Sequence, residues 1–321
     1  PMAGPSVLIF HRPARAEEST LVRLLAHVRG RLAQSQARLF ARAGAGEVHW
    51  IERSEDAAAP ASFGEALADR LPARGGLIVL GSGAVPRLTG TDARRLVSVA
   101  ASGDRRALTN NRYSSDICAI AQARPLRALP ALPSDNALPR WLEESAGFAV
   151  EVMADRERLA LDIDTVQDIA LWALAPGAPA WLRRLVMAER IGIPRLAELR
   201  ELATDPHREL LVLGRSGSAT LRWLERNVRC RVRFLSEERG LRASSPLAIG
   251  PAATAGRHPP RPPRATLGRL LERDGPEALG HLVGELADGA IIDSRVLLAD
   301  RLGADESRWP APADRYASDL L

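Results

Sequence analysis

The sequence predicts an α/β protein whose first half forms a mainly parallel sheet covered by helices on both faces. Two observations lead to this fold class. Short apolar runs alternate along the chain with longer segments in which apolar residues recur at helical spacing. Several of the runs, above all "GLIVLGS", are apolar along nearly their whole length, which is typical of strands buried on both faces of a sheet.

The elements of the first half follow in chain order. Strands are expected at Ser6–His11, Glu47–Glu52, Gly76–Ser82, within Ala107–Ala121, and at Phe148–Met153. Helices are expected at Ser19–Ala43, Ser62–Leu71, from about Thr91, and at Ala137–Ala146. We interpret Leu159–Ile163 as a last strand, with Gly76–Gly81 at the centre of the sheet.

A segment rich in Pro, Gly and Ala at Ala175–Ala180 marks the expected domain boundary. We therefore expect one domain at 1–175 and a C-terminal α/β region at 176–321, which contains a Pro-rich loop at 243–265. In that region Leu210–Thr220, "LLVLGRSGSAT", is either an anion cradle between strand and helix or a plain turn. Asp293 is either a site carboxylate or a helix cap.

Composition excludes several kinds of chemistry. All 44 basic residues are arginine, so a Schiff-base lysine and a Walker-type phosphate lysine are absent. The formal charge of +5 is spread along the chain, which makes nucleic acid an unlikely partner. The two cysteines form no metal motif, and no apolar run is long enough for a membrane span, so we expect a cytoplasmic protein.

Two carboxylates interrupt the apolar run Leu159–Leu174, "LALDIDTVQDIALWAL". If the run begins as a strand, Asp162 and Asp164 point to the same side and can share a cation. The alternative is capping, in which Asp164 or Thr165 accepts hydrogen bonds from the free N–H groups of the following helix. The sequence alone leaves both interpretations open.

Five stretches together resemble a known enzyme family. In chain order they are "FGEALADRL", "GGLIVLGSGAVPRLTGTDARRLV", "ALTNNRYSSDICAIA", "DNALPRWLEES" and "LALDIDTVQDIALW". They resemble the nucleotidyltransferases of the 2-phospho-L-lactate guanylyltransferase and molybdenum-cofactor guanylyltransferase type. The resemblance covers about 62–174. It implies the three-layer α/β fold of nucleotide-diphospho-sugar transferases, with a nucleoside triphosphate held by the first loop.

The resemblance also implies a divalent cation, Mg²⁺ or Mn²⁺, that binds together with the nucleotide. Asp162 and Asp164 match the late carboxylate segment and are the expected metal ligands. The other expected carboxylate is missing, because Gly83 stands at its position within Gly81–Thr89, "GSGAVPRLT". The first loop, "HRPARAEEST", also lacks the Gly-rich turn of the family. Both departures affect positions that would bind phosphate or metal.

Two groups of binding residues are expected from the same motifs. The substrate-binding group contains short polar side chains and one arginine: Asn110, Asn111, Arg112, Ser114 and Ser115. The alternative for this group is a polar turn that bonds its own backbone. The nucleotide-binding group is Gly81, Ser82 and Arg87.

The functional hypothesis is transfer of a nucleoside monophosphate from a nucleoside triphosphate to a phosphorylated small molecule. The alternative is a catalytically inactive relative that serves as a ligand-binding or scaffolding subunit. The expected partners are a nucleotide and a small phosphorylated molecule, and a homodimer is a further expectation.

Overall fold

Two units follow each other along the chain in the computed structural model, Pro1–Gly192 and Ile193–Leu321. The structure describes residues 4–52, 62–130, 132, 135–154, 157–193, 195–237 and 264–302. The first unit extends past the boundary expected at 175/176, because helix α6 (Ala180–Ala188) packs on α5 (Val166–Leu174). The Pro-rich loop at 243–265 lies outside the described residues except at its last two positions.

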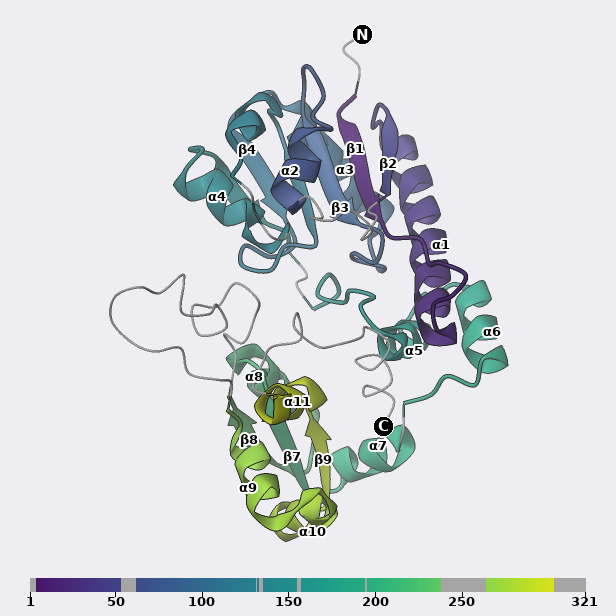
Figure 1. The fold of residues 1–321 in the computed structure, drawn as a ribbon, viewed down its shortest axis with the longest axis vertical. Helices are drawn as coiled ribbons and strands as arrows, with labels where there is room; N and C mark the ends of the chain where they lie inside the picture. The colour runs from purple at the N-terminus through teal and green to yellow at the C-terminus, as the bar shows by residue number, and fades with distance from the viewer. Residues whose placement is uncertain are drawn as a thin grey trace. The chain divides into compact units, whose positions relative to one another are not determined.

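A six-stranded sheet forms the centre of the first unit (Figure 1). Its strands are β1 (Ser6–His11), β2 (Val48–Glu52), β3 (Leu77–Gly81), β4 (Arg106–Thr109), β5 (Ile117–Ile120) and β6 (Ala149–Val152). They lie in the order β2-β1-β3-β5-β4-β6, and only β5 runs antiparallel to its neighbours. The predicted α/β class is therefore confirmed, with β3 in the centre.

One predicted strand is wrong. Residues 160–164 have no regular secondary structure and add no strand to the sheet. Their backbone bonds are made elsewhere: Ile163 N donates to Gly83 O at 3.0 Å, and Leu159 O accepts from the Asn110 side chain at 3.0 Å. An apolar run of this length is equally compatible with a buried loop.

Helices cover both faces of the sheet and complete three layers (Figure 1). Alternate strand residues make the two cores: Val7 and Ile9 face one layer, and Leu8 and Phe10 face the other. The first layer contains α1 (Thr20–Arg42) and α3 (Gly90–Ala101). The second contains α2 (Phe63–Ala68), α4 (Leu138–Glu144) and the 3-10 helices η1 (Arg124–Ala128) and η2 (Asp135–Ala137).

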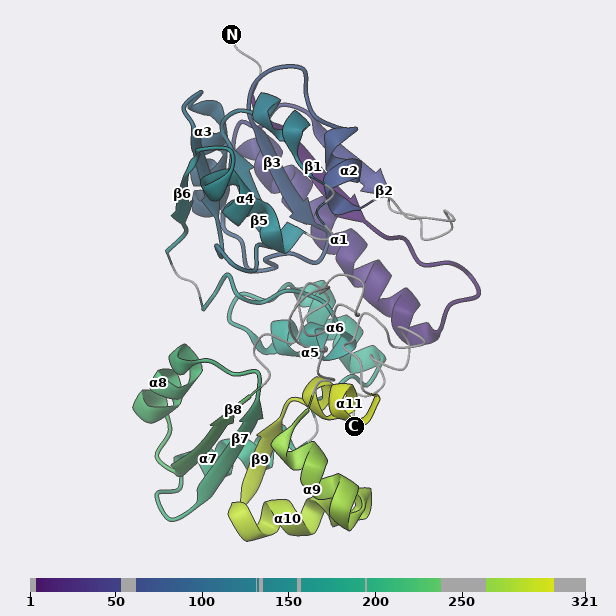
Figure 2. The same ribbon diagram turned by 60° about the vertical axis from the view of Figure 1, so that its left-hand side comes forward.

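Helix α1 extends beyond the carboxyl edge of the sheet, as Figures 1 and 2 both show. It begins after Ser19, whose side chain accepts a hydrogen bond from Val22 N, and apolar residues at helical spacing bury one face. A Cβ on Gly30 would lie 3.7 Å from the His11 ring at the end of β1. The first ten residues of the helix therefore lie past the strand end.

The second unit repeats the three-layer plan on a smaller scale. Strands β7 (Glu209–Gly214), β8 (Arg231–Ser236) and β9 (Gly289–Ile292) are all parallel, in the order β8-β7-β9. One face packs on α7 (Leu196–Thr204) and α8 (Ser218–Asn227). The other packs on α9 (Thr266–Asp274), α10 (Leu279–Leu286) and α11 (Ser294–Leu302), and η4 (Pro276–Ala278) links α9 to α10.

A charged contact joins the start of α3 to the segment before residue 160. Thr89 and Asp92 form a capping box at this helix end. Arg158 binds both carboxylate oxygens of Asp92, at 2.8 and 3.1 Å, and also donates to Arg87 O at 2.7 Å. Burial alone would raise the pKa of Asp92, but the hydrogen bonds from Arg158 and Thr89 hold it below its ordinary value.

We expect Asp92→Asn to lower the free energy of unfolding at pH 7 by about 2 kcal/mol, because it weakens a helix cap and a bidentate ion pair together. The stability supplied by the charge is present above the unfolded-state pKa and is lost as pH falls through the lowered folded-state value. Urea unfolding from pH 7 to pH 3 measures both effects. Glu65→Gln, in the capping box of α2, is the control without an arginine partner, and an equal loss in both variants would contradict the prediction.

Candidate functional site

The carboxyl ends of β1 and β3 lie side by side and are joined by side chains. Phe10 pairs with Gly81 in the last register position of the two strands. The His11 ring Nδ1 and Ser82 Oγ are 3.0 Å apart, and Ser82 N donates to Phe10 O at 2.8 Å. Ligands of open α/β sheets bind beyond such strand ends. A ligand site is therefore expected at this edge.

A groove opens at this edge between the loop after β1 and the projecting part of α1. Its volume is about 780 Å³. Its lining is mainly basic or small: His11, Pro13, Ala14, Arg15, Ala16, Arg23, Ala26, His27, Gly30, Arg31 and Gln34. No carboxylate is among the described residues that line it. The groove therefore suits an anionic ligand.

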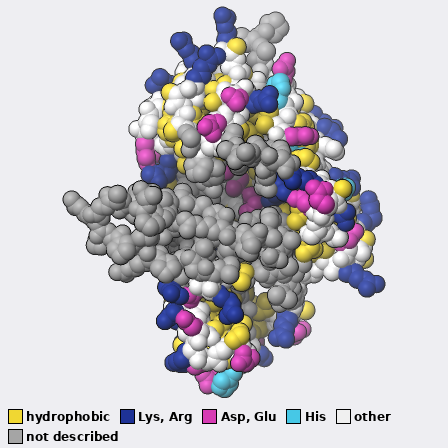
Figure 3. Space-filling view, viewed as in Figure 1, with side chains coloured by type: hydrophobic (Ala, Val, Ile, Leu, Met, Phe, Trp, Pro, Cys, Tyr) yellow, Lys and Arg dark blue, Asp and Glu magenta, His cyan; other side chains and the backbone are white. Residues whose placement is uncertain are grey.

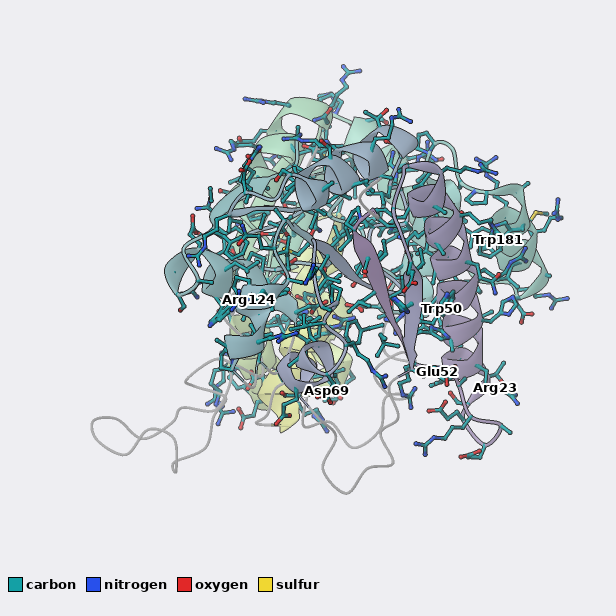
Figure 4. The ribbon with its side chains drawn as sticks, turned by 90° about the horizontal axis from the view of Figure 1, so that it is seen from above. Arg23, Trp50, Glu52, Asp69, Arg124 and Trp181 are labelled. Carbon is teal, nitrogen blue, oxygen red and sulfur yellow. The ribbon has the colours of Figure 1, made fainter. Side chains whose placement is uncertain are left out.

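Glu18 helps to hold the loop that forms one wall of the groove. Glu18 forms an ion pair with Arg12 and accepts a hydrogen bond from Arg15 N at 2.8 Å. On α1, the Arg31 guanidinium lies 4.3 Å from the centre of the Trp181 ring, which fixes its direction. Figure 4 shows Trp181 on one side of α1 and Trp50, on β2, on the other.

His11 connects the groove to the sheet. Burial lowers the pKa of His11, and the positive charge of Arg29 lowers it further, whereas Glu52 opposes both effects. Its ring also meets the Trp50 ring edge-on, with the ring centres 5.6 Å apart. The neutral imidazole is thus favoured next to Ser82.

The two predicted metal ligands lie close to Gly83, in the loop after β3. A Cβ on Gly83 would lie 2.7 Å from Ile163 O, 3.0 Å from Arg29 Nε and 3.2 Å from Asp162 Oδ1. Arg29 Nε donates to Ile163 O at 2.5 Å, and Arg29 Nη2 binds Asp164 Oδ1 at 3.0 Å. The place of the missing carboxylate is therefore filled by backbone and by an arginine.

The two aspartates have different surroundings. Burial raises the pKa of Asp162 well above its ordinary value, and the charges of Asp164 and Asp116 raise it further, while Arg29 acts in the opposite direction. Asp164 is exposed and paired with Arg29. Capping of α5 is carried out by the next residue, since Asp168 N donates to Thr165 Oγ1 and Thr165 N donates back to the Asp168 carboxylate at 2.7 Å.

The residues present do not fit a divalent cation on their own. Within the described residues, no three His, Cys, Asp or Glu side chains are grouped so that they could hold a metal ion. Asp164 is engaged by Arg29, and Gly83 has no room for a side chain. Mg²⁺ or Mn²⁺ brought in by the phosphates of a nucleotide stays a prediction.

The predicted substrate-binding residues lie after β4, and two of them are enclosed by their own hydrogen bonds. The Asn110 side chain donates to Asp116 Oδ2 at 2.7 Å and to Leu159 O at 3.0 Å, and its oxygen accepts from Asp116 N at 3.0 Å. Ser115 is buried, with Oγ 3.0 Å from Thr109 Oγ1. These contacts match the polar-turn alternative.

The other members of that group also bond to neighbouring parts of the protein. Arg112 donates to Val150 O at 2.9 Å and pairs with Glu143 at 3.3 Å, so its guanidinium is directed toward β6 and α4. Asn111 accepts from the backbone N–H two residues on at 3.1 Å, and Ser114 donates to an asparagine of η2 at 2.9 Å. Substrate binding by the five residues stays a prediction.

The predicted nucleotide-binding residues also lie in two different places. Gly81 is the last residue of β3, and Ser82 follows it next to His11, at the sheet edge that carries the groove. Arg87 is half-buried in the β3–α3 loop, and its carbonyl oxygen accepts from Arg158. Their role toward a nucleotide also stays a prediction.

Two features of this edge are not among the site residues predicted from the sequence. Arg23, His27 and Arg31 recur every fourth residue in "RLLAHVRGR", and this spacing places a basic stripe on one face of the predicted helix. The stripe could have been found from that pattern. Arg29 has no such signal, because its partners are more than 130 residues away in the chain.

In the second unit, the carboxyl ends of β7 and β9 are joined by an ion pair. Arg215 Nε donates to Asp293 Oδ2 at 2.7 Å, and Arg215 Nη2 lies 3.3 Å from the other oxygen. Gly214 has a φ of +129°, which favours glycine, and a Cβ there would lie 2.3 Å from the Asp293 Cβ. Arg295 N donates to Asp293 at 3.2 Å, as the cap interpretation requires.

Comparison with known proteins finds a similar solved structure but no matching family. No protein-family model matches the chain, and no curated protein matches it. Among solved structures, it is similar to that of a putative nucleotide-diphospho-sugar transferase from Desulfovibrio desulfuricans G20. The two share 14% identity with a TM-score of 0.41, over 60% of this chain and 100% of the other. In the described part of the chain, no helix is both long and apolar enough to cross a membrane.

We expect Gly83→Ala to lower the free energy of unfolding by roughly 1–3 kcal/mol, because its Cβ would press on Ile163 O at 2.7 Å. Gly81→Ala is the matched control, since nothing lies within 4 Å of a Cβ at that position. Chemical denaturation of both variants measures the difference. Equal stabilities would mean that residues 160–164 can move away from the β3–α3 loop without cost.

We expect His11 to make stability depend on pH in the weakly acidic range. Its folded-state pKa lies below the unfolded value of about 6.5, so the neutral form is favoured by the fold. Stability should be full above pH 6.5 and should fall as pH drops toward the folded-state pKa. His11→Gln should remove this slope in denaturation curves, and His281→Gln, in the other unit, controls for loss of a histidine as such. A slope unchanged in His11→Gln would contradict the assignment.

Proposed function

We propose that the first unit is a nucleotidyltransferase-like protein that binds the phosphate groups of a nucleotide or of a phosphorylated small molecule in the basic groove. One observation carries the proposal: three arginines and two histidines line a groove at the carboxyl end of β1, with no carboxylate among the described lining residues. Guanidinium groups match phosphate oxygens in geometry and charge. In a chain without lysine, arginine is the side chain left for this task.

The position of the groove on α1 supports the same ligand class. The groove residues of α1 begin with Arg23 in the first turn of the helix, where the helix dipole adds positive potential for an anion. In the loop, the Glu18 carboxylate is already engaged by Arg12 and by Arg15 N. On the face in Figure 3, by contrast, basic and acidic side chains of the described residues are interspersed.

Two outcomes of binding remain as hypotheses. In transfer, an acceptor oxygen forms a bond to the α-phosphorus of a nucleoside triphosphate while the bond to pyrophosphate breaks. In the alternative, the protein binds its ligand without reaction. The crowded Gly83 and the Arg29 contact of Asp164 favour binding without transfer, because the carboxylate pair expected of an active enzyme is incomplete.

An assay for both outcomes needs two measurements on the full chain. Calorimetry with GTP, CTP and pyrophosphate reports binding, whereas phosphorus NMR reports release of pyrophosphate when 2-phospho-L-lactate is added as acceptor. Binding without release would establish the ligand-binding alternative. Absence of binding for all three phosphates at millimolar concentration would overturn the proposed function.

We expect Arg23→Gln to weaken binding of GTP or pyrophosphate by about 3- to 10-fold and to reduce the dependence of affinity on salt, because one charge of the groove is lost. Arg38→Gln is the matched control: it removes the same charge from the same helix about one turn beyond Gln34, the last groove residue of α1. Titration calorimetry at two salt concentrations measures both variants. An equal effect of the two substitutions would show that only net charge matters and would contradict a groove site.

A further inference from the structure

Arg29 occupies the position at which the sequence resemblance expects a carboxylate and its cation. The Cβ point of Gly83, where that carboxylate would start, lies 3.0 Å from Arg29 Nε and 3.2 Å from Asp162 Oδ1. The guanidinium therefore lies within a few ångströms of the Asp162 carboxylate and binds Asp164 directly. The positive charge that balances the two aspartates belongs to the protein itself.

The position of this charge is fixed by the fold. Arg29 stands between the buried residues Val28 and Leu32 of α1, and its side chain is only 23% exposed. Nε is held by Ile163 O at 2.5 Å and Nη2 by Asp164 Oδ1 at 3.0 Å. A guanidinium cannot lose its proton at physiological pH. Unlike a diffusing metal ion, it is present before any ligand arrives.

The same contacts work against a divalent ion. A second cation beside Asp162 would be repelled by the guanidinium, and Asp164 could serve as a ligand only after giving up its ion pair. Mg²⁺ normally uses one or two carboxylates and keeps several waters. The open space that such a hydrated ion needs is reduced by the backbone at Ile163, 2.7 Å from the Gly83 Cβ point.

We propose that the Arg29 guanidinium takes the place of the divalent cation in this chain, so that a phosphate ligand is bound without Mg²⁺ or Mn²⁺. The ligand part of the inference rests on the proposed function, whereas the exclusion of the metal rests on the Arg29 contacts alone. Arg29 is a positioning and charge-balancing residue here. The ligand class that follows is the free phosphate form, not its magnesium complex.

The metal part is tested with Mn²⁺ as the probe and no nucleotide present. The signal of free Mn²⁺ in electron paramagnetic resonance is followed as the full chain is added. We expect the parent chain and Arg29→Lys, which keeps the charge, to leave Mn²⁺ free up to about millimolar concentration. Arg29→Ala should bind Mn²⁺ at least about tenfold more tightly, because Asp162 and Asp164 lose their cation.

Two further variants keep this test decisive. Arg38→Ala removes an arginine from the same helix away from the aspartates and should leave Mn²⁺ binding unchanged. If Arg29→Ala lowers the melting temperature, Arg29→Gln removes the charge and keeps an amide donor for Ile163 O. Tight Mn²⁺ binding by the parent chain, or no gain in either neutral variant, would overturn the proposal.

The ligand part is tested by calorimetry with GTP in the presence of Mg²⁺ or of a chelator. We expect the parent chain to bind GTP with equal or lower affinity when Mg²⁺ is in excess, because the metal complex carries less negative charge. Tightening by about tenfold with Mg²⁺ would overturn metal-free binding. If GTP and pyrophosphate bind under neither condition, the proposed function fails, while the Mn²⁺ measurement still decides the role of Arg29.

Discussion

The contact between the backbone at Ile163 and the backbone at Gly83 determines the geometry of the whole sheet edge. Ile163 N donates to Gly83 O at 3.0 Å, so two loops that are distant in sequence run against each other. Only a residue without Cβ permits this approach, since a Cβ would lie 2.7 Å from Ile163 O. A carboxylate at residue 83 and the observed path of residues 160–164 therefore exclude each other.

Other contacts hold the same segment in place. Asn110 binds Leu159 O, and Arg158 binds Asp92 at the start of α3. The ends of β3 and β4 are thus tied to one loop that is not part of the sheet. Asn110 is almost fully buried and has partners for both ends of its amide, which is how a polar side chain is accommodated in a core. The amide groups of Asn110 that were expected to bind a ligand make these structural hydrogen bonds instead.

Much of the fold could be predicted because local rules and tertiary packing agree. Helix α1 was expected at Ser19–Ala43, and it forms at Thr20–Arg42 because Ser19 caps it and apolar residues repeat on its inner face. Strand β3 follows from its apolar run, since it is buried on both faces. The strand expected at Leu159–Ile163 does not form. Leu159 and Ile163 are buried, as strand residues would be, but the backbone bonds of the segment go to loops and side chains.

The site was less predictable because its charges come together only in three dimensions. The two-residue spacing placed Asp162 and Asp164 on one side of a strand, but without the strand one is half-buried and the other is exposed. Arg29 lies on the inner side of α1, where charged side chains are rare unless paired. Its partners are backbone and carboxylate atoms of a loop that no local pattern assigns to it.

Because α1 extends past the end of β1, two of its faces can take different tasks. One face lines the groove, and the other faces the two aspartates. Arg23, His27 and Arg31 line the groove on one face, and Arg29 on the inner side meets the aspartates. His11 lies between them, against Gly30 and bonded to Ser82 at the end of β3. Burial and the positive charge of Arg29 lower the pKa of this imidazole. The arginines of the edge carry a charge that does not change with pH. A phosphate ligand at this edge would meet a charge pattern that is built into the helix before it binds.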